Sequence, residues 1–152
     1  MEKKYNFYGW ETANISPTKN PYINNKLFKN PKELYDVLSE IWSKETCAPR
    51  MRKDWTKENK TLGQCSITSF LVQDIFGGKV YGYKLPDGNF HCYNVIGNCK
   101  FDLTSEQFNN SNQIINYENN PEQLRENHFK KEEKKQRYEY LKNELNKKLY
   151  YD

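Results

Sequence analysis

The chain has 152 residues, of which 36% are hydrophobic and 29% charged, and its formal net charge is +4. This length fits one domain with a single core, and an aromatic content of 15% argues against disorder throughout. No segment reaches the roughly 18 apolar residues of a membrane span, and the first residues, Met1 to Asn6, lack the apolar region of a signal peptide. We therefore expect a cytoplasmic protein that has no membrane partner.

The charges and cysteines exclude two further classes of site. Lysines alternate with glutamates, most densely from Lys130 to Lys148. Such mixed signs are typical of a solvated helix face, whereas a nucleic-acid interface needs a patch of one sign. In a reducing compartment we expect free thiols, and the spacing lacks the paired Cys-x-x-Cys of a zinc site. We predict no metal, no cofactor and no nucleic acid. The cysteines are Cys47, Cys65, Cys92 and Cys99.

The first part of the chain predicts an irregular arm followed by one domain. Residues 1–30 show no period, and we expect their aromatic side chains to lay this arm over the domain formed by residues 31–152. A helix should begin at Pro31 with Asn30 as its N-cap. Residues 44–62 are loop-like, and Trp55 lies among them.

The segment from Gly63 to Gly78 is the most informative part of the sequence. Its apolar residues recur at helical spacing, and the two glycines at its end stop a helix. Cys65 therefore lies at the start of a buried helix, directly after Gln64 and a glycine that allows a tight turn. The apolar stripe is Ile67, Phe70, Leu71 and Ile75.

Three strands and a last helix should follow. The strands are 79–85, 89–96 and 99–103, joined at Pro86-Asp87-Gly88 and at Gly97-Asn98 into an antiparallel meander. Asn120-Pro121 should cap and begin the C-terminal helix. We expect that helix to pack on the domain through an apolar stripe rather than to form a coiled-coil dimer. The stripe is Tyr138, Leu141, Leu145 and Leu149.

A Cys-His-Asp triad is the chemistry that these positions favour. A helix dipole and a nearby imidazolium both lower the pKa of a cysteine, and Cys65 has the first of these features. If Gly97-Asn98 is a two-residue loop, Asn94 pairs with Phe101, and His91 and Asp102 become diagonal neighbours on one face. Asp102 would then orient the His91 base.

Other roles remain open for these residues. Cys65 is otherwise a buried inert thiol, His91 a satisfied strand histidine, and Asp102 a cap of the following turn. We expect His128 to be solvated, and Cys92 and Cys99 to be structural thiols. The helix start supplies backbone donors for an oxyanion. The predicted oxyanion or substrate-binding side chains are Gln64, Tyr93, Asn94 and Trp55.

The motifs resemble the YunG-like family of small bacterial proteins. They are Ile41-Trp42-Ser43-x-Glu45-Thr46, Gly63-Gln64-Cys65-x-Ile67-Thr68, His91-x-Tyr93-Asn94 and Asp102-Leu103-Thr104-x-x-Gln107-Phe108. The resemblance covers roughly residues 34–149 at the helix and strand spacing above. It implies an α+β fold of papain-like or transglutaminase-like type, with the nucleophile at the start of a helix packed on a small antiparallel sheet, and a C-terminal helix. It implies no substrate. Cys92 stands where we expect Tyr or Trp.

Two functions compete. The first is a cysteine hydrolase or acyltransferase that acts on the amide, thioester or isopeptide carbonyl of a peptide or small molecule, or of another protein. The alternative is a non-catalytic binding module on the same fold, for example in bacterial or phage defence. Reactivity of the Cys65 thiol below its ordinary pKa separates them.

Overall fold

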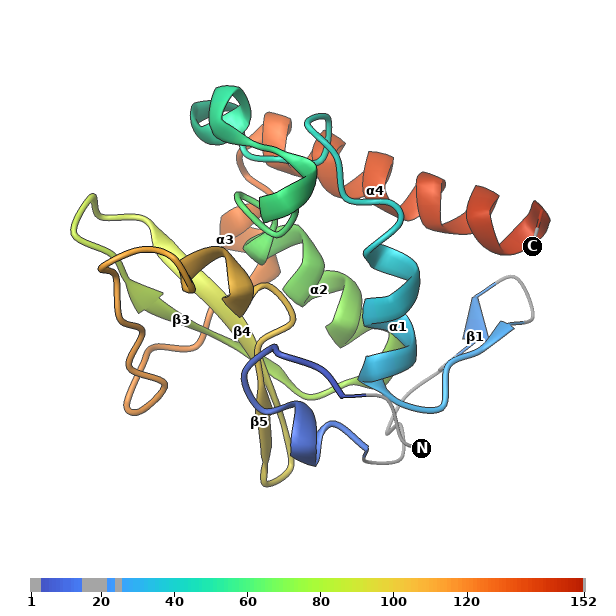
Figure 1. Ribbon diagram of the computed structural model, residues 1–152, viewed down its shortest axis with the longest axis horizontal. Helices are drawn as coiled ribbons and strands as arrows, with labels where there is room; N and C mark the ends of the chain where they lie inside the picture. Colours follow the sequence, from blue (N-terminus) through green and yellow to red (C-terminus); the bar gives the residue numbers. More distant parts are fainter. Residues whose placement is uncertain (1–3, 15–21, 24–25, 152) are drawn as a thin grey trace.

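A three-stranded antiparallel sheet lies against one central helix in the computed structural model (Figure 1). The strands are β3 (Lys79–Lys84), β4 (Phe90–Ile96) and β5 (Cys99–Phe101), in that spatial order. The structure describes residues 4–14, 22–23 and 26–151. The other positions of the expected arm, and residue 152, lie outside the described residues.

The meander forms because its two turns have the residues that they need. At the first, the Asp87 carboxylate accepts from the Asn89 N–H at 2.8 Å. At the second, Gly97 has a φ of 59°, which glycine adopts without strain. Asn94 pairs with Phe101 and Ile96 with Cys99, so the predicted two-residue loop and register are confirmed.

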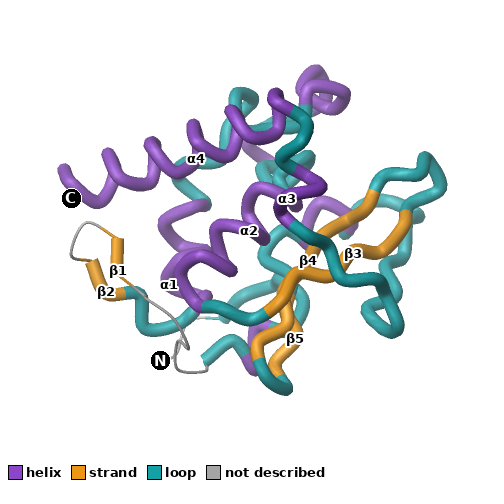
Figure 2. Tube along the Cα trace, turned by 180° about the vertical axis from the view of Figure 1, so that it is seen from behind, coloured by secondary structure: helices purple, strands orange, loops and turns teal. Residues whose placement is uncertain are grey.

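Helix α2 (Cys65–Phe76) lies between the sheet and the C-terminal helix, as Figures 1 and 2 show from opposite sides. The predicted stripe, from Ile67 to Ile75, is buried. The helix ends at Gly77, which has a φ of 87°. Helix α1 (Pro31–Leu38) begins as predicted, because the Asn30 side chain accepts from the Glu33 N–H at 3.1 Å.

The predicted start of the C-terminal helix at Asn120-Pro121 is wrong. Residues 121–123 are extended and pair with β3: the Gly82 N–H donates to the Pro121 carbonyl at 3.0 Å, and the Gln123 N–H donates to the Val80 carbonyl at 2.8 Å. A helix starting here would give up this pairing. The chain forms α3 (Arg125–His128), turns, and then forms α4 (Glu132–Tyr151). The expected burial of Tyr138, Leu141 and Leu145 is confirmed.

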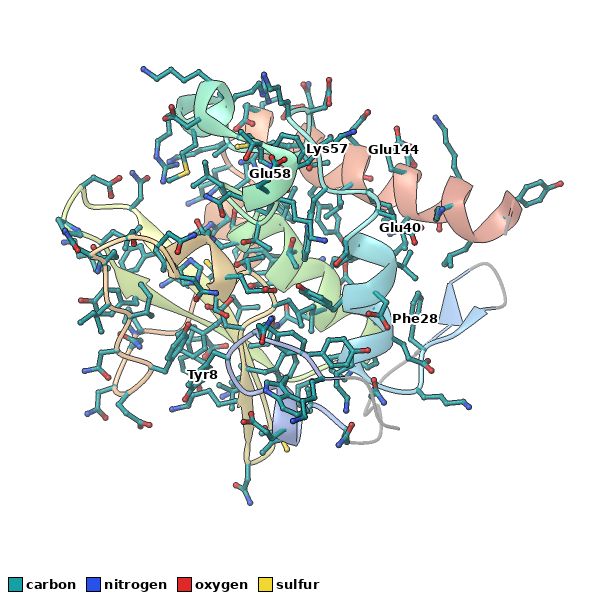
Figure 3. The ribbon with its side chains drawn as sticks, viewed as in Figure 1. Tyr8, Phe28, Glu40, Lys57, Glu58 and Glu144 are labelled. Carbon is teal, nitrogen blue, oxygen red and sulfur yellow. The ribbon has the colours of Figure 1, made fainter. Side chains whose placement is uncertain are left out.

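The described part of the N-terminal arm belongs to the core. Phe7, Ala13 and Phe28 are fully buried, and the Asp102 N–H donates to the Tyr8 carbonyl at 2.9 Å. Figure 3 places Phe28 beside α1 and Tyr8 near β5. Two short strands, β1 (Tyr22–Ile23) and β2 (Lys26–Leu27), pair with each other.

The expected loop at 44–62 contains two 3-10 helices, Pro49–Asp54 and Lys57–Asn59. The architecture is therefore a mixed α+β arrangement of a small antiparallel sheet and a C-terminal helix. Among the described helices, none is both long and apolar enough to cross a membrane.

Candidate active site

The Cys65 thiol is held by the turn that precedes α2. Gly63 has a φ of 73°, and a Cβ added there would lie 2.5 Å from the Cys47 sulfur, so only glycine fits. The Gly63 carbonyl accepts from the Ala48 N–H at 2.9 Å and from Arg137 Nη1 at 3.4 Å. The loop before α2 and helix α4 thus fix the turn, and Cys65 becomes the first residue of the helix.

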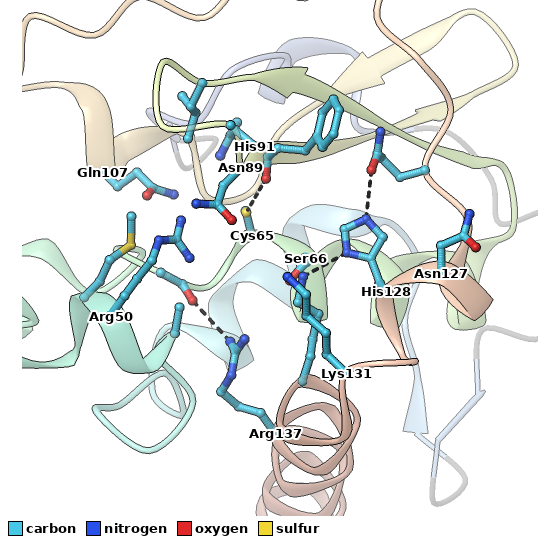
Figure 4. Close-up of a pocket in the computed structure, with 18 of the residues that line it drawn as sticks. Arg50, Cys65, Ser66, Asn89, His91, Gln107, Asn127, His128, Lys131 and Arg137 are labelled. Atoms are coloured by element: carbon cyan, nitrogen blue, oxygen red, sulfur yellow. Dashed lines mark hydrogen bonds between the residues drawn. The ribbon is translucent and has the colours of Figure 1, made fainter.

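Cys65 opens onto a cavity of about 450 Å³ (Figure 4). Its walls come from the loop before α2, the start of α2, the β3–β4 turn with the start of β4, and the chain from α3 to the start of α4. In Figure 4, the amide side chains of Asn89 and Gln107 point toward the Cys65 sulfur. The thiol is partly exposed, so a small molecule can reach it.

His91 and Asp102 form a buried pair beside this cavity. His91 Nε2 lies 2.5 Å from Asp102 Oδ2, and both side chains are 1% exposed. Asp102 is itself held on its other oxygen, because Oδ1 accepts from the Thr104 N–H at 3.0 Å and from the Thr104 hydroxyl at 3.2 Å. The Tyr117 hydroxyl donates to Oδ2 at 2.7 Å. The carboxylate is therefore saturated with donors and fixes the imidazole.

Charge coupling links His91 to Cys65. Burial opposes protonation of His91, but the charge and hydrogen bond of Asp102, followed by those of Cys65, outweigh it and raise the pKa of His91 to about 10. Because Asp102 occupies Nε2, the ring nitrogen that faces the thiol is Nδ1. The charge on this ring in turn favours the thiolate form of Cys65.

Cys92 also influences the Cys65 thiol. A hydrogen bond from the Cys92 thiol is the largest cause that lowers the pKa of Cys65 well below its ordinary value; burial opposes it, and the His91 hydrogen bond and charge lower it further. The same contact raises the pKa of Cys92. Cys92 therefore keeps its proton and donates it toward the Cys65 sulfur. Its complete burial in the core agrees with the structural thiol that we expected.

The two partners lie on opposite faces of β4. Cys92 and Asn94 face α2, since Cys92 is part of the core and Asn94 Nδ2 donates to the Ser69 carbonyl at 2.9 Å. By alternation His91 points to the other face. Both reach Cys65 because the sulfur lies at the beginning of the strand, 3.8 Å from the Phe90 carbonyl oxygen.

The four predicted oxyanion or substrate-binding side chains lie outside the cavity lining. Gln64 is fully buried, and its Nε2 donates to the Ser43 carbonyl at 3.1 Å. Trp55 donates to the Lys60 carbonyl and borders a different hollow. The Tyr93 hydroxyl contacts the Tyr117 carbonyl at 3.2 Å, and Asn94 is tied to α2. In each case the polar group donates to a backbone carbonyl that lies outside the cavity lining.

His128 is a site residue that sequence reasoning missed. We expected it to be solvated, but it lines the cavity, with Nε2 2.8 Å from Gln123 Oε1 and Nδ1 2.9 Å from Lys134 Nζ. Burial and then Lys134 lower its pKa to about 4. Nothing local in the sequence marks this position, because the extended 121–123 segment that brings it to the site depends on pairing with β3.

The remaining thiols differ in setting. Cys47 is buried against Gly63, and burial raises its pKa. Cys99 is partly exposed on β5 and does not border the Cys65 cavity.

Comparison with known proteins identifies the family of this chain. The YunG protein family matches residues 30–150. "Uncharacterized protein YunG" of Bacillus subtilis (strain 168) is 36% identical over 72 residues, a stretch that covers 47% of this chain and 57% of the relative. The matched chain thus spans little more than half the length of that curated relative. No solved structure matches significantly. The family match covers most of the sequence and includes Cys65, His91 and Asp102, and the chain belongs to the YunG family.

Proposed function

We propose that this chain is a cysteine hydrolase or acyltransferase that acts on amide, thioester or isopeptide carbonyls through Cys65, His91 and Asp102, on a papain-like fold. One observation carries the proposal. Cys65 begins helix α2 on the wall of a cavity that His91 also lines, and His91 Nε2 lies 2.5 Å from the buried Asp102 carboxylate. Nucleophile, base and orienting acid thus stand in the order that covalent catalysis requires.

The first half of the reaction forms a thioester. The Cys65 sulfur attacks the carbonyl carbon, a C–S bond forms, and the carbonyl π electrons move to oxygen. As the intermediate collapses, the leaving amine or thiol departs with its bonding pair and takes the proton from His91 Nδ1. In the second half, water or an amine attacks the thioester and gives its proton to Nδ1, and the Cys65 sulfur leaves as a thiolate.

Donors for the developing oxyanion are available at the start of α2. The first N–H groups of a helix have no partner within it, and the Gln64 side chain makes no cap hydrogen bond there. Asn89 and Gln107 also line the cavity with side-chain amides. Gln107 Nε2 already donates to the Thr104 carbonyl at 2.9 Å, so Asn89 is the side-chain donor that we assign in place of Gln64.

Acylation of Cys65 tests the proposal. We expect p-nitrophenyl acetate to acetylate Cys65 of the native protein with release of p-nitrophenolate, detected by absorbance and by mass mapping of the thioester. His91→Ala should slow this step by roughly a hundredfold or more, the usual contribution of a positioned base. Cys99→Ser is the matched control, because Cys99 is also partly exposed but does not border the cavity.

Two results would count against catalysis. One is acetylation of Cys99 at the same rate as Cys65, and the other is a Cys65 rate that does not change in His91→Ala. The chain would then be a binding module that carries a triad-like arrangement.

A further inference from the structure

The cavity around Cys65 is lined by positive charge. Four cationic side chains border it, and Glu122 is its single acidic one among the described residues. Glu122 Oε1 lies 3.9 Å from Lys79 Nζ in an exposed pair, so the cavity has one negative side chain against four positive ones. The cations are Arg50, Lys131, Lys134 and Arg137.

Not all of these cations are free to meet a ligand. Arg137 Nε lies 2.6 Å from Glu133 Oε1, and its Nη1 donates to the Thr46 and Gly63 carbonyls. Arg137 therefore links α4 to the loop before α2 and is not available to a ligand. Arg50 lies 3.9 Å from Asp87, an exposed and loose pair. Lys131 and Lys134 have no carboxylate partner in the part of the chain that the structure describes.

Lys134 is the best placed of these cations. It is partly buried in the first turn of α4, and its Nζ lies 2.9 Å from His128 Nδ1. The His128 ring is neutral, so Nδ1 accepts from the ammonium while Nε2–H donates to Gln123 Oε1 at 2.8 Å. The chain Gln123–His128–Lys134 therefore holds a positive charge at the cavity wall without neutralising it.

The negative charge that Lys134 experiences comes from the site itself. Burial lowers the pKa of Lys134, and the charge of the Cys65 sulfur is the largest influence that opposes this lowering. The ammonium thus lies within electrostatic reach of the nucleophile. Because Lys134 and Cys65 line the same cavity, a single ligand can contact both.

We propose that Lys134, together with Arg50 and Lys131, forms an anion subsite, and that the acyl substrate of Cys65 carries a carboxylate or phosphate group close to the reacting carbonyl. This inference rests on the proposed function, because it names the class of substrate for the same nucleophile.

A pair of alkylating probes of nearly the same size tests the subsite. Iodoacetate carries a carboxylate and iodoacetamide a neutral amide. We expect the ratio of the iodoacetate rate to the iodoacetamide rate at Cys65 to exceed the ratio for free glutathione. In Lys134→Gln this ratio should fall about fivefold or more, which is what one charge pair at 4 Å gives even at the dielectric constant of water.

Matched variants separate the subsite from general charge effects. Lys135→Gln removes the same charge from the next residue of α4, which is exposed and does not border the cavity, and should leave the ratio unchanged. Arg50→Gln, on the separate 3-10 helix Pro49–Asp54, should lower the ratio as well. If Lys134→Gln does not fold, the ratio measured for Arg50→Gln still tests the subsite.

Protection of Cys65 from labelling shows which anionic group the subsite binds. Acetate and inorganic phosphate, each added at constant ionic strength, should slow iodoacetamide labelling of the wild type according to which group fits, and the effect should be lost in Lys134→Gln. A wild-type ratio equal to that of glutathione, unchanged in both cavity variants, would overturn the subsite while leaving the nucleophile intact. Slow labelling of the wild type by iodoacetamide itself would instead refute the proposed function.

Discussion

Two donors converge on the Cys65 sulfur, and they have different origins. His91 brings a positive charge that Asp102 maintains, while Cys92 brings a neutral S–H group from the opposite face of β4. A hydrogen bond to a charged acceptor stabilises it more than one to a neutral acceptor. The low pKa of Cys65 therefore depends on a residue that carries no charge and lies inside the core.

Cys92→Ala should raise the pKa of Cys65 by about one pH unit, because the thiolate loses a hydrogen bond worth roughly 1.5 kcal/mol. The pH dependence of iodoacetamide labelling at Cys65 measures the shift. Cys92→Ser retains a donor at nearly the same position and serves as the control. Identical pH profiles for the wild type and the alanine variant would mean that Cys92 does not donate to the thiolate.

At the residue scale, sequence reasoning could place Cys65 at a helix start and His91 beside Asp102, because each position follows from local spacing around a turn. It could not identify Cys92 as a donor. The alternation of side chains along β4 predicts that Cys92 faces α2. Its approach to Cys65 depends on where the start of α2 lies along β4, and no local sequence pattern gives that position. The amide side chains that line the cavity could not be predicted from sequence proximity either. Gln64 is adjacent to Cys65 in sequence, yet Asn89 and Gln107 are the ones that line the cavity.

At the scale of elements, local sequence signals predicted correctly a helix start and a hairpin register. Asn30 and Pro31 fixed the start of α1, and Gly97-Asn98 fixed the register of β4 with β5. The start of the C-terminal helix was misread because its cap-like residues, Asn120 and Pro121, are used by β3 instead. Tertiary pairing overrode a good local signal, as it often does for helix ends.

Helix α4 has two tasks along its length. Its first turns bring Lys134 and Arg137 to the cavity, while Leu141 and Leu145 are fully buried against the domain. Leu141→Ala should lower the free energy of unfolding by roughly 2–5 kcal/mol, through lost burial and the cavity left behind. Urea unfolding followed by circular dichroism measures this loss.

Glu139→Ala, an exposed position on the same helix, is the control for the Leu141 experiment and should change stability by less than about 0.5 kcal/mol. An unfolding midpoint of Leu141→Ala that matches this control would show that the later turns of α4 do not stabilise the domain in solution.

At the scale of the whole molecule, the buried pair connects the site to folding stability. In the folded chain, the pKa of His91 is raised to about 10 and that of Cys65 is lowered well below its ordinary value, so between these two pKa values the imidazole is charged and the thiol is ionised. In the unfolded chain, with ordinary pKa values of 6.5 and 9.0, the imidazole is neutral and the thiol is protonated between those two pH values. Both states then bind one proton at these two residues. The pair therefore adds no slope to the stability of the wild type in that window.

Cys65→Ser should break this balance. The serine does not titrate, while Asp102, the larger source of the raised pKa of His91, still keeps the imidazole protonated in the folded state. The folded variant then binds one proton more than its unfolded state above pH 6.5. Stability that is fully present below this pH is lost as the pH rises, by up to about 1.4 kcal/mol per pH unit relative to the wild type.

Urea unfolding of both proteins at several pH values between 6.5 and 9.0 measures this divergence. The double variant Cys65→Ser, His91→Gln removes the second titrating group, so its stability should again run parallel to that of the wild type. If Cys65→Ser itself runs parallel to the wild type, His91 is neutral once the thiolate is gone. In that case Cys65, and not Asp102, is what keeps the imidazole charged, and the carboxylate serves only to orient the ring.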